Sequence, residues 1–338
     1  MRHPANSWAV AVPVAAALAI GLGATALFDP ASAGVAVVAL LEPFLLAAGL
    51  FGLAACLLSG ARAIAGGLGV GLLLGFLALH NPGRLRLAEA ELPGWSNQLR
   101  DCALVASSQP QPFRLLWWQV DGSPSPSALF TLLDARPDVV VLDGLSDPKL
   151  LDALGAELPG ETLWLTDEEP GGPMGVAVRG SFQYCGGETD RWHLDLPGGH
   201  AGAVMLLPQI EQRGLLPLVL VHGPRSPLDG GSRRFASDTR DAIAALRALT
   251  LQLGPRGLLI LGDLRAPQPF LDGAMEPVGL TEVSLPPSWP MVVGPLPGLP
   301  LVPEARLWRG EGWVVRSVER MAAGDAASAP LLMELSPR

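Results

Sequence analysis

Three long apolar runs occupy the first 80 residues of the chain. Residues 8–28 form 21 consecutive positions without a charged side chain. As a helix this run would match the hydrocarbon thickness of a bilayer, about 30 Å. Two further runs, residues 42–59 and 63–79, are separated by a short turn and read as a helical hairpin. The pattern predicts a transmembrane anchor of three helices over residues 1–80. A cleaved signal peptide is the alternative for the first run, but that run is long for one and apolar segments follow at once.

The third apolar run carries a regular series of small residues. Gly67, Gly71 and Gly75 recur every four positions, so on a helix they would form one smooth ridge. A ridge of this kind lets another helix approach closely. It could pack against the first two helices of the same chain, or it could bind a helix of another membrane protein.

After a polar stretch the rhythm changes to short apolar runs, which predicts a different kind of domain. We expect a juxtamembrane linker over residues 81–110 and a globular domain over residues 111–338. Helices are expected at residues 127–135 and 237–253, with Ser237 as a candidate N-cap. Many strands and few helices indicate an α+β layered sandwich. Strands are expected at residues 113–120, 137–142, 163–166, 175–178, 204–207, 216–222, 258–263, 313–315 and 331–335.

Composition and charge separate the two parts further. The chain is 49% hydrophobic and 16% charged, with a formal net charge of −9. The first 80 residues hold only Arg2, Asp29, Glu42 and Arg62 as charged side chains, so the whole net charge belongs to the rest. An acidic domain disfavours the counterion release that drives most nucleic-acid binding. We therefore expect no nucleic-acid partner.

The distribution of arginines gives a first expectation for sidedness. An arrangement with the N-terminus in the cytoplasm puts Arg2 and Arg62 inside and leaves Arg84 and Arg86 outside. Three spans then carry the globular domain across the membrane. We expect a protein of the bacterial inner membrane with a periplasmic C-terminal domain. Cys102 and Cys185 could pair there or remain free.

The segment from residue 285 to residue 303 is rich in proline. Proline has no backbone N–H, so we expect this stretch to be stiff, extended and unsuited to sheet pairing. Such a segment could lie along the surface of another protein, or it could be a long loop.

Five short motifs end or follow the expected strands in a recognisable order. They are Trp118-Gln119-Val120, residues 137–144, Val221-His222-Gly223, Gly262-Asp263-Leu264-Arg265 and residues 326–330. The order resembles the endonuclease/exonuclease/phosphatase superfamily, the DNase I-like fold, and more narrowly its bacterial members with N-terminal membrane helices. The resemblance implies a four-layer α/β sandwich. It also implies metal-assisted attack on a phosphoester, with carboxylates holding Mg²⁺ and a His–Asp pair positioning water.

The framework of that family is kept better here than its chemistry. His222 and Asp263 match the family pattern and are the candidate catalytic residues. Gln119 stands where the family has Asn, and Gly144 stands where it has a metal-binding Glu, with Asp143 next to it. Mg²⁺ prefers hard oxygen ligands in octahedral geometry, so the loss of one carboxylate matters.

The later motifs also lack residues that the family uses for metal binding and proton transfer. Arg265 replaces the second amide and puts a cation near the expected metal. In the final signature Ala327 and Ser328 stand where the family has Asp and His. Upstream, Ala305 follows Glu304 at a position where many members have His. Neither Ala nor Ser can act as the general acid and base that the family uses.

Two hypotheses for function follow. The first is a catalytically degenerate domain that needs no cofactor and serves as a structural or accessory subunit of a membrane complex, with integral membrane partners along Gly67, Gly71 and Gly75. The alternative is a membrane-anchored, Mg²⁺-dependent phosphoester hydrolase with a rearranged site. In that case Asp143, Asp263 and Asp325 are the candidate metal ligands.

Overall fold

A computed structural model of the chain describes part of the sequence, most of it beyond residue 111. The linker, Cys56, Cys102 and Cys185 lie outside the described residues. The described positions are 67, 69–70, 112–122, 128, 132–145, 148–158, 160–164, 174–179, 191–196, 200–208, 215–222, 232–263, 274–288, 292–293, 296–297, 305–322 and 328–338.

The chain divides into two compact units. One comprises residues 88–225, 241–264 and 275–338 and contains both large sheets, and the other comprises residues 1–87, 226–240 and 265–274. In the second unit the described positions near the N-terminus, 67, 69 and 70, are helical. Gly67 is exposed there, and a β-carbon built on it would meet no atom within 4 Å. Gly71 and Gly75 lie outside the described residues.

Membrane-crossing helices can be assessed only at the described positions. Among them, no helix has both the length and the apolar character needed to cross a membrane. The three expected spans fall almost entirely outside these positions and remain a prediction.

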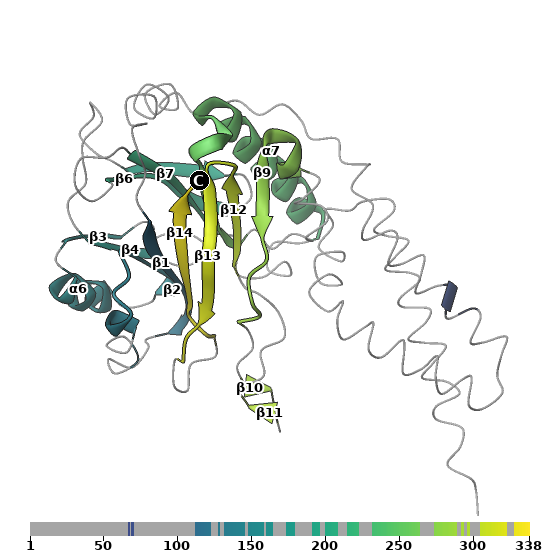
Figure 1. The fold of residues 1–338 in the computed structure, drawn as a ribbon. Helices are drawn as coiled ribbons and strands as arrows, with labels where there is room; N and C mark the ends of the chain where they lie inside the picture. The colour runs from purple at the N-terminus through teal and green to yellow at the C-terminus, as the bar shows by residue number, and fades with distance from the viewer. Residues whose placement is uncertain are drawn as a thin grey trace, which may run out of the picture. The chain divides into compact units, whose positions relative to one another are not determined.

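The first large sheet, sheet A, has six strands in the order β13-β14-β1-β2-β4-β3 (Figure 1). β1 and β2 are parallel, and every other neighbouring pair in the sheet is antiparallel. The strands are β1 (Phe113–Gly122), β2 (Val139–Leu145), β3 (Gly160–Trp164), β4 (Met174–Arg179), β13 (Trp313–Arg320) and β14 (Leu331–Pro337).

The second large sheet, sheet B, has six strands in the order β5-β6-β7-β8-β12-β9. Here β7 and β8 are the parallel pair. The strands are β5 (Arg191–Leu196), β6 (His200–Pro208), β7 (Leu215–His222), β8 (Leu259–Asp263), β9 (Leu280–Val283) and β12 (Arg306–Gly310). Each sheet therefore has one parallel pair at its centre.

The start of β2 shows how local sequence sets the pairing of strands. Asp138 precedes the strand, and its carboxylate oxygen Oδ2 accepts a hydrogen bond of 2.8 Å from the backbone N–H of Arg114 in β1. The Asp138 backbone N–H in turn donates to the Arg114 carbonyl at 2.8 Å. The run of β-branched residues that follows is buried on both faces, as expected of a central strand. Asp138 thus fixes the register of β1 against β2.

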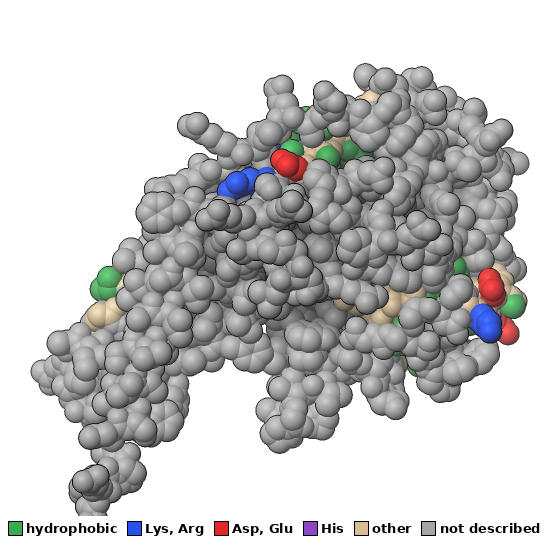
Figure 2. All heavy atoms as spheres, turned by 180° about the vertical axis from the view of Figure 1, so that it is seen from behind, with side chains coloured by type: hydrophobic (Ala, Val, Ile, Leu, Met, Phe, Trp, Pro, Cys, Tyr) green, Lys and Arg blue, Asp and Glu red, His purple; other side chains and the backbone are tan. Residues whose placement is uncertain are grey.

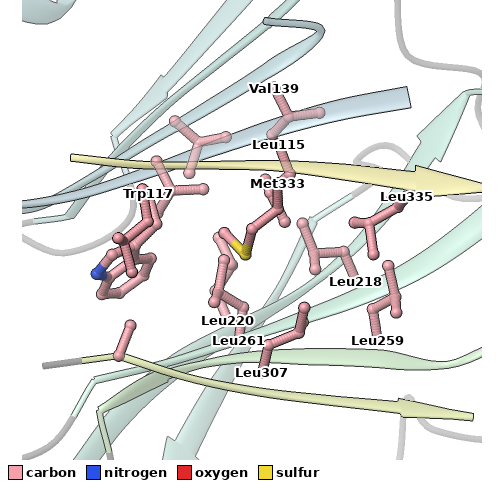
Figure 3. Close-up of a cluster of buried hydrophobic side chains, with 14 of the residues drawn as sticks. Leu115, Trp117, Val139, Leu218, Leu220, Leu259, Leu261, Leu307, Met333 and Leu335 are labelled. Carbon is pink, nitrogen blue, oxygen red and sulfur yellow. The ribbon is translucent and has the colours of Figure 1, made fainter. Parts of the chain in front are cut away.

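The two sheets pack face to face around one apolar core (Figure 3). Alternate residues of the central strands point into it, because successive side chains of a strand point to opposite faces. The labelled side chains from sheet A meet those of sheet B across this layer. They are Leu115, Trp117, Val139, Met333 and Leu335 from sheet A, and Leu218, Leu220, Leu259, Leu261 and Leu307 from sheet B.

Helix packing is described for the outer face of sheet A, and a longer helix has a buried stripe of its own. Helix α6 (Pro148–Glu157) contributes Leu151 and Leu154 to a second cluster on the outer face of sheet A. Helix α7 (Ser232–Leu253) carries a buried stripe at Ile243, Leu246 and Leu249. Sheet B has buried side chains on its outer face, such as Trp308, which a helix of this kind can cover. Two mixed sheets with few helices confirm the expected layered α+β sandwich.

Most of the expected elements are present. All nine expected strands overlap observed ones, although β3 starts and ends earlier than expected and β13 extends to Arg320. In the expected helix at 127–135, the described positions 128 and 132–134 are helical. The predicted start of the late helix at Ser237 is wrong, since α7 begins at Ser232.

The sequence patterns did not predict α6, β5, β9 or β12. β9 and β12 are short and carry charged residues, so neither forms an apolar run. Helix α6 does show helical spacing of Leu151, Leu154 and Leu158, all of them buried. That spacing, after Pro148 at the first helical position, was the signal that could have identified it.

Candidate functional site

The two central parallel pairs end in the residues that the sequence marks as candidates. In sheet A, Gln119 of β1 is the register partner of Asp143 of β2. In sheet B, His222 of β7 is the register partner of Asp263 of β8. All four therefore stand at the carboxyl ends of their strands, where side chains of parallel strands come together.

The two pairs lie at the same end of the sandwich. In Figure 3 β1 runs from Leu115 toward Trp117, away from Leu335, while β7 runs from Leu218 to Leu220 in the same sense. β8 follows β7, because the two are parallel. The carboxyl ends of the four strands thus point to one end of the inter-sheet core, which we call the site end.

Strand alternation also gives the direction of three candidate side chains. Leu115 and Trp117 belong to the inter-sheet core, so Gln119 is on the same face of β1. By the same count Asp143 follows Val139 and Val141, and Asp263 follows Leu259 and Leu261. Gln119, Asp143 and Asp263 all face the space between the sheets. Of His222 the structure describes the backbone alone.

Asp143 is fully buried, with 0% of its surface exposed, whereas Asp263 and Gln119 are partly buried. A buried carboxylate is costly unless other groups stabilise it, so it is rarely kept without a reason. Because Asp143 is the register partner of Gln119, it is the acidic residue beside the amide in this site. The expected metal-binding position at residue 144 carries no side chain that could replace it.

Gly144 has a backbone conformation that disfavours any other residue. Its φ is +76°, and a β-carbon there would lie 2.8 Å from the carbonyl oxygen of Val120 in β1. The close approach belongs to an irregularity in the pairing of β1 with β2 after Gln119. Glycine at this position is therefore a structural requirement of the present backbone.

The other sheet uses a glycine in a similar place. Gly262 precedes Asp263 and has a φ of +152°. A β-carbon on Gly262 would lie only 1.7 Å from the carbonyl oxygen of Val221 in β7. This glycine lets β8 approach β7 closely enough for His222 and Asp263 to stand in register.

The C-terminal signature is anchored beside β1. The indole Nε1 of Trp118 donates a buried hydrogen bond of 3.0 Å to the carbonyl of Ser328. The next residue, Ala329, donates its backbone N–H to the carbonyl of Ser288 at 3.0 Å. Ser328 is 2% exposed, so this residue is packed into the domain.

These contacts correct one expectation for the Pro-rich segment. Leu285 packs in the inter-sheet core, and Ser288 is buried against the C-terminal loop. Further along, β10 (Val292–Val293) pairs with β11 (Leu296–Pro297), so the prediction that this stretch takes no part in sheet pairing is wrong. Residues between the prolines supply the donors that proline lacks. Only part of the segment is therefore available to another protein.

Several candidate residues fall in the part of the chain that the structure does not describe. They are Asp325, Arg265, Ala327 and Glu304. Within the described part of the chain, no three His, Cys, Asp or Glu side chains are grouped closely enough to hold a metal ion.

One face of the molecule offers little further chemistry at its described residues. On the face shown in Figure 2, the described acidic and basic side chains lie singly or in small groups of mixed sign. The described green side chains are scattered over the same face.

Comparison with solved structures finds similar proteins. No protein-family model matches the chain, and no curated protein matches its sequence. The structure is similar to that of D. rerio TDP2 in complex with single-strand DNA product, with 13% identity, 67% of this chain and 99% of the other covered, and a TM-score of 0.46. An endonuclease/exonuclease/phosphatase from Beutenbergia cavernae gives 15% identity, with 67% of this chain and 72% of the other covered, and a TM-score of 0.46. The human Nocturnin catalytic domain gives 13% identity, with 70% of this chain and 99% of the other covered, and a TM-score of 0.46. These are similarities of fold.

Two contributors to the site were missed by sequence reasoning. Trp118 ties the C-terminal loop to β1, and Asp138 sets the register that brings Asp143 beside Gln119. The position of Asp138 directly after Pro137, at the start of a strand, was a usable signal, since Asp often orders the backbone at such points. The partner of Trp118 lies 210 residues away, and no local pattern indicates it.

Proposed function

We propose that residues 111–338 form a phosphoesterase-like domain that has lost hydrolytic activity, and that the chain is an accessory subunit of a membrane protein complex. The observation that carries this proposal is the conformation of Gly144. The backbone φ there is positive, and a β-carbon added to this residue would lie 2.8 Å from a neighbouring carbonyl oxygen. A metal-binding Glu at this position would require the ends of β1 and β2 to be rebuilt.

The C-terminal loop gives independent support. The family's His is replaced by Ser328, whose position is fixed by the Trp118 hydrogen bond and whose surface is 2% exposed. A serine hydroxyl has no pKa near neutrality and cannot take the place of imidazole in proton transfer. The domain thus keeps the scaffold of a hydrolase without two of the groups that its chemistry needs.

The role in a membrane complex rests on the N-terminal sequence. The three apolar runs of residues 1–80 would hold the chain in the bacterial inner membrane, with the globular domain on the periplasmic side. Small residues at Gly67, Gly71 and Gly75 suit close contact with a helix of another integral membrane subunit. The exposure of Gly67 is compatible with such a contact.

An activity assay tests the loss of hydrolysis. The full chain, extracted in a mild detergent, is incubated with phosphomonoesters and phosphodiesters and millimolar Mg²⁺ or Mn²⁺, in parallel with Asp263→Ala. The proposal predicts equal background rates for the two proteins. Metal-dependent hydrolysis that disappears in Asp263→Ala would overturn it.

A second candidate function is a working Mg²⁺-dependent hydrolase, and one observation favours it. Asp143 and Asp263 face the same inter-sheet space at the site end, and His222 stands beside Asp263 in register. Carboxylate oxygens together with the Gln119 amide form a donor set that suits Mg²⁺. With Asp325 as a third carboxylate, these residues would hold the ion, which would polarise a phosphoryl oxygen.

Titration calorimetry separates this candidate from the first. Mg²⁺ and Mn²⁺ are titrated into the full chain and into Asp143→Asn and Asp263→Asn. A working site requires binding in the native chain that weakens at least about tenfold in each variant. No binding at millimolar metal would leave the degenerate domain as the account of this site.

A further inference from the structure

The site end of the core contains a buried indole donor that has no acceptor among the described residues. Trp117 is 2% exposed, and its Nε1 has no hydrogen-bond partner in the described part of the chain. Figure 3 shows this nitrogen on the side of the ring that faces away from the labelled leucines, toward the site end. Buried N–H groups are nearly always paired, so an unpaired one requires an explanation.

A buried acceptor lies two residues further along the same face of β1. The side-chain oxygen Oε1 of Gln119 is covered from solvent and has no donor among the described residues. The Cα atoms of residues i and i+2 of a strand are about 7 Å apart, and the two side chains are on the same face. Two hydrogen bonds of about 3 Å through one oxygen atom would join a donor and an acceptor about 6 Å apart.

The opposite end of the same core gives a direct contrast. Trp313 is also 2% exposed and also belongs to the inter-sheet core. Its Nε1 donates to the backbone carbonyl of Gly257 at 2.9 Å. The domain therefore pairs the indole at one end with its own backbone and leaves the indole at the site end without a partner among the described residues.

We propose that Trp117 and Gln119 form the floor of a binding site for a single O–H group, either a hydroxyl of a bound polyol or a water molecule. An O–H group both accepts from the indole N–H and donates to the amide oxygen. A fully ionised phosphoryl oxygen can only accept, and an ammonium group can only donate. Both protein atoms are covered from solvent, so the O–H group is sealed from bulk water and its binding moves the atoms that cover them.

The neighbouring carboxylates favour the same chemistry. Asp143 and Asp263 face the inter-sheet space at this end, and their oxygens accept hydrogen bonds from hydroxyl groups. The inference rests on the proposed function for the place of the site, and it gives the degenerate domain a ligand class that differs from phosphoesters.

Indole resonances test the proposal directly. The full chain is labelled with ¹⁵N at tryptophan and prepared in a detergent without a sugar headgroup, and Trp117→Phe and Trp313→Phe assign two of the nine indole signals. Glycerol, an uncharged polyol, and inorganic phosphate are titrated separately. Nuclear Overhauser contacts from each indole proton to water and to glycerol are recorded.

Two results would support the proposal, and they separate the two sources of the O–H group. A glycerol-dependent shift of the Trp117 signal, with no shift of Trp313, identifies a hydroxyl ligand. In that case Gln119→Met should weaken glycerol binding about fivefold or more, because the acceptor is lost while the bulk is kept. A contact between the Trp117 indole proton and slowly exchanging water, without a glycerol response, identifies a bound water.

Two other results would overturn it. One is a Trp117 signal that responds to inorganic phosphate alone. The other is a Trp117 signal that contacts neither water nor glycerol and does not shift. Neither result affects the size of the native assembly or the hydrolysis assay, so a failure here is distinguishable from a failure of the proposed function.

Discussion

The two ends of the sandwich differ in how their buried polar groups are hydrogen-bonded. At the end opposite the site, which we call the closed end, the 3-10 turn η4 (Pro255–Gly257) packs against the turn between β12 and β13. The backbone N–H of Gly310 donates to Leu258 and that of Gly312 donates to Arg256, both at 2.9 Å. The indole of Trp313 adds a bond to Gly257 and stacks edge-to-face on Phe113 with ring centres 5.5 Å apart.

The site end leaves polar groups inside the domain instead. Trp117 Nε1 and Gln119 Oε1 are covered there without a partner in the described part of the chain. In stable domains most buried polar groups have a hydrogen-bond partner, and a group that lacks one calls for an explanation, which a functional site can give. The closed end is therefore held by its own backbone and indole hydrogen bonds, and the site end is where we place the proposed binding site.

The largest expected effects come from close backbone approaches, which both ends contain. A β-carbon at Gly262 would lie 1.7 Å from the Val221 carbonyl oxygen, and one at Gly310 would lie 1.7 Å from that of Pro255. Gly262→Ala and Gly310→Ala should each lower the free energy of unfolding by about 3 kcal/mol or more, as seen in chemical denaturation. Gly257→Ala is the matched control, because a β-carbon there meets nothing within 4 Å. If either variant were as stable as the control, the close approach at that end would be wrong.

A smaller effect is expected from an attempt to restore the family's acidic residue. Gly144→Glu forces a non-glycine residue into a φ of +76° with a β-carbon contact of 2.8 Å. We expect a loss of about 2 kcal/mol in the free energy of unfolding and no gain of Mg²⁺ binding by calorimetry. Asp143→Glu is measured alongside, because it adds a glutamate at a position that already faces the inter-sheet space. Tight Mg²⁺ binding by Gly144→Glu would contradict the structural argument for lost activity.

Removal of one donor at the closed end should cost less. Trp313→Phe keeps an aromatic ring beside Phe113, removes the pyrrole part of the indole, and leaves the Gly257 carbonyl without its indole donor. A loss of about 1–2 kcal/mol is expected in thermal or chemical unfolding. An unchanged midpoint would mean that the closed end does not depend on this hydrogen bond.

The smallest effect is expected at a surface ion pair of the closed end. Arg256 and Glu311 approach to 3.7 Å, with side chains 84% and 72% exposed. Such pairs add little, so Glu311→Gln should change the free energy of unfolding by less than about 0.5 kcal/mol. A clear destabilisation in denaturant would show that charge, and not the fit of the backbone, holds the turn.

Apolar runs made the central strands predictable. β2 and β8 are short, almost wholly apolar and buried on both faces, so their sequences alone indicate central strands. The edge strand β9 and its neighbour β12 carry charged residues such as Glu282 and Arg306, which form an ion pair of 2.8 Å. β9 and β12 form strands because they pair with residues distant in the sequence, and a local sequence pattern does not contain that information.

The candidate site was predictable in its residues and less so in its geometry. The positions of Gln119, His222 and Asp263 followed from strand ends and from the family resemblance. That Asp143, and not residue 144, faces the inter-sheet space beside Gln119 depends on the register of β1 against β2. The role of Trp117 depends on which of its polar contacts are missing, and only the packed structure contains that information.

We propose that the chain serves within a membrane assembly. This proposal is tested most directly by the native size and composition of the protein after gentle detergent extraction from its own membranes, with co-migrating proteins identified by mass spectrometry. The account predicts migration in a large assembly with stoichiometric integral membrane partners. Migration alone, near the mass of a monomer or dimer, would contradict it.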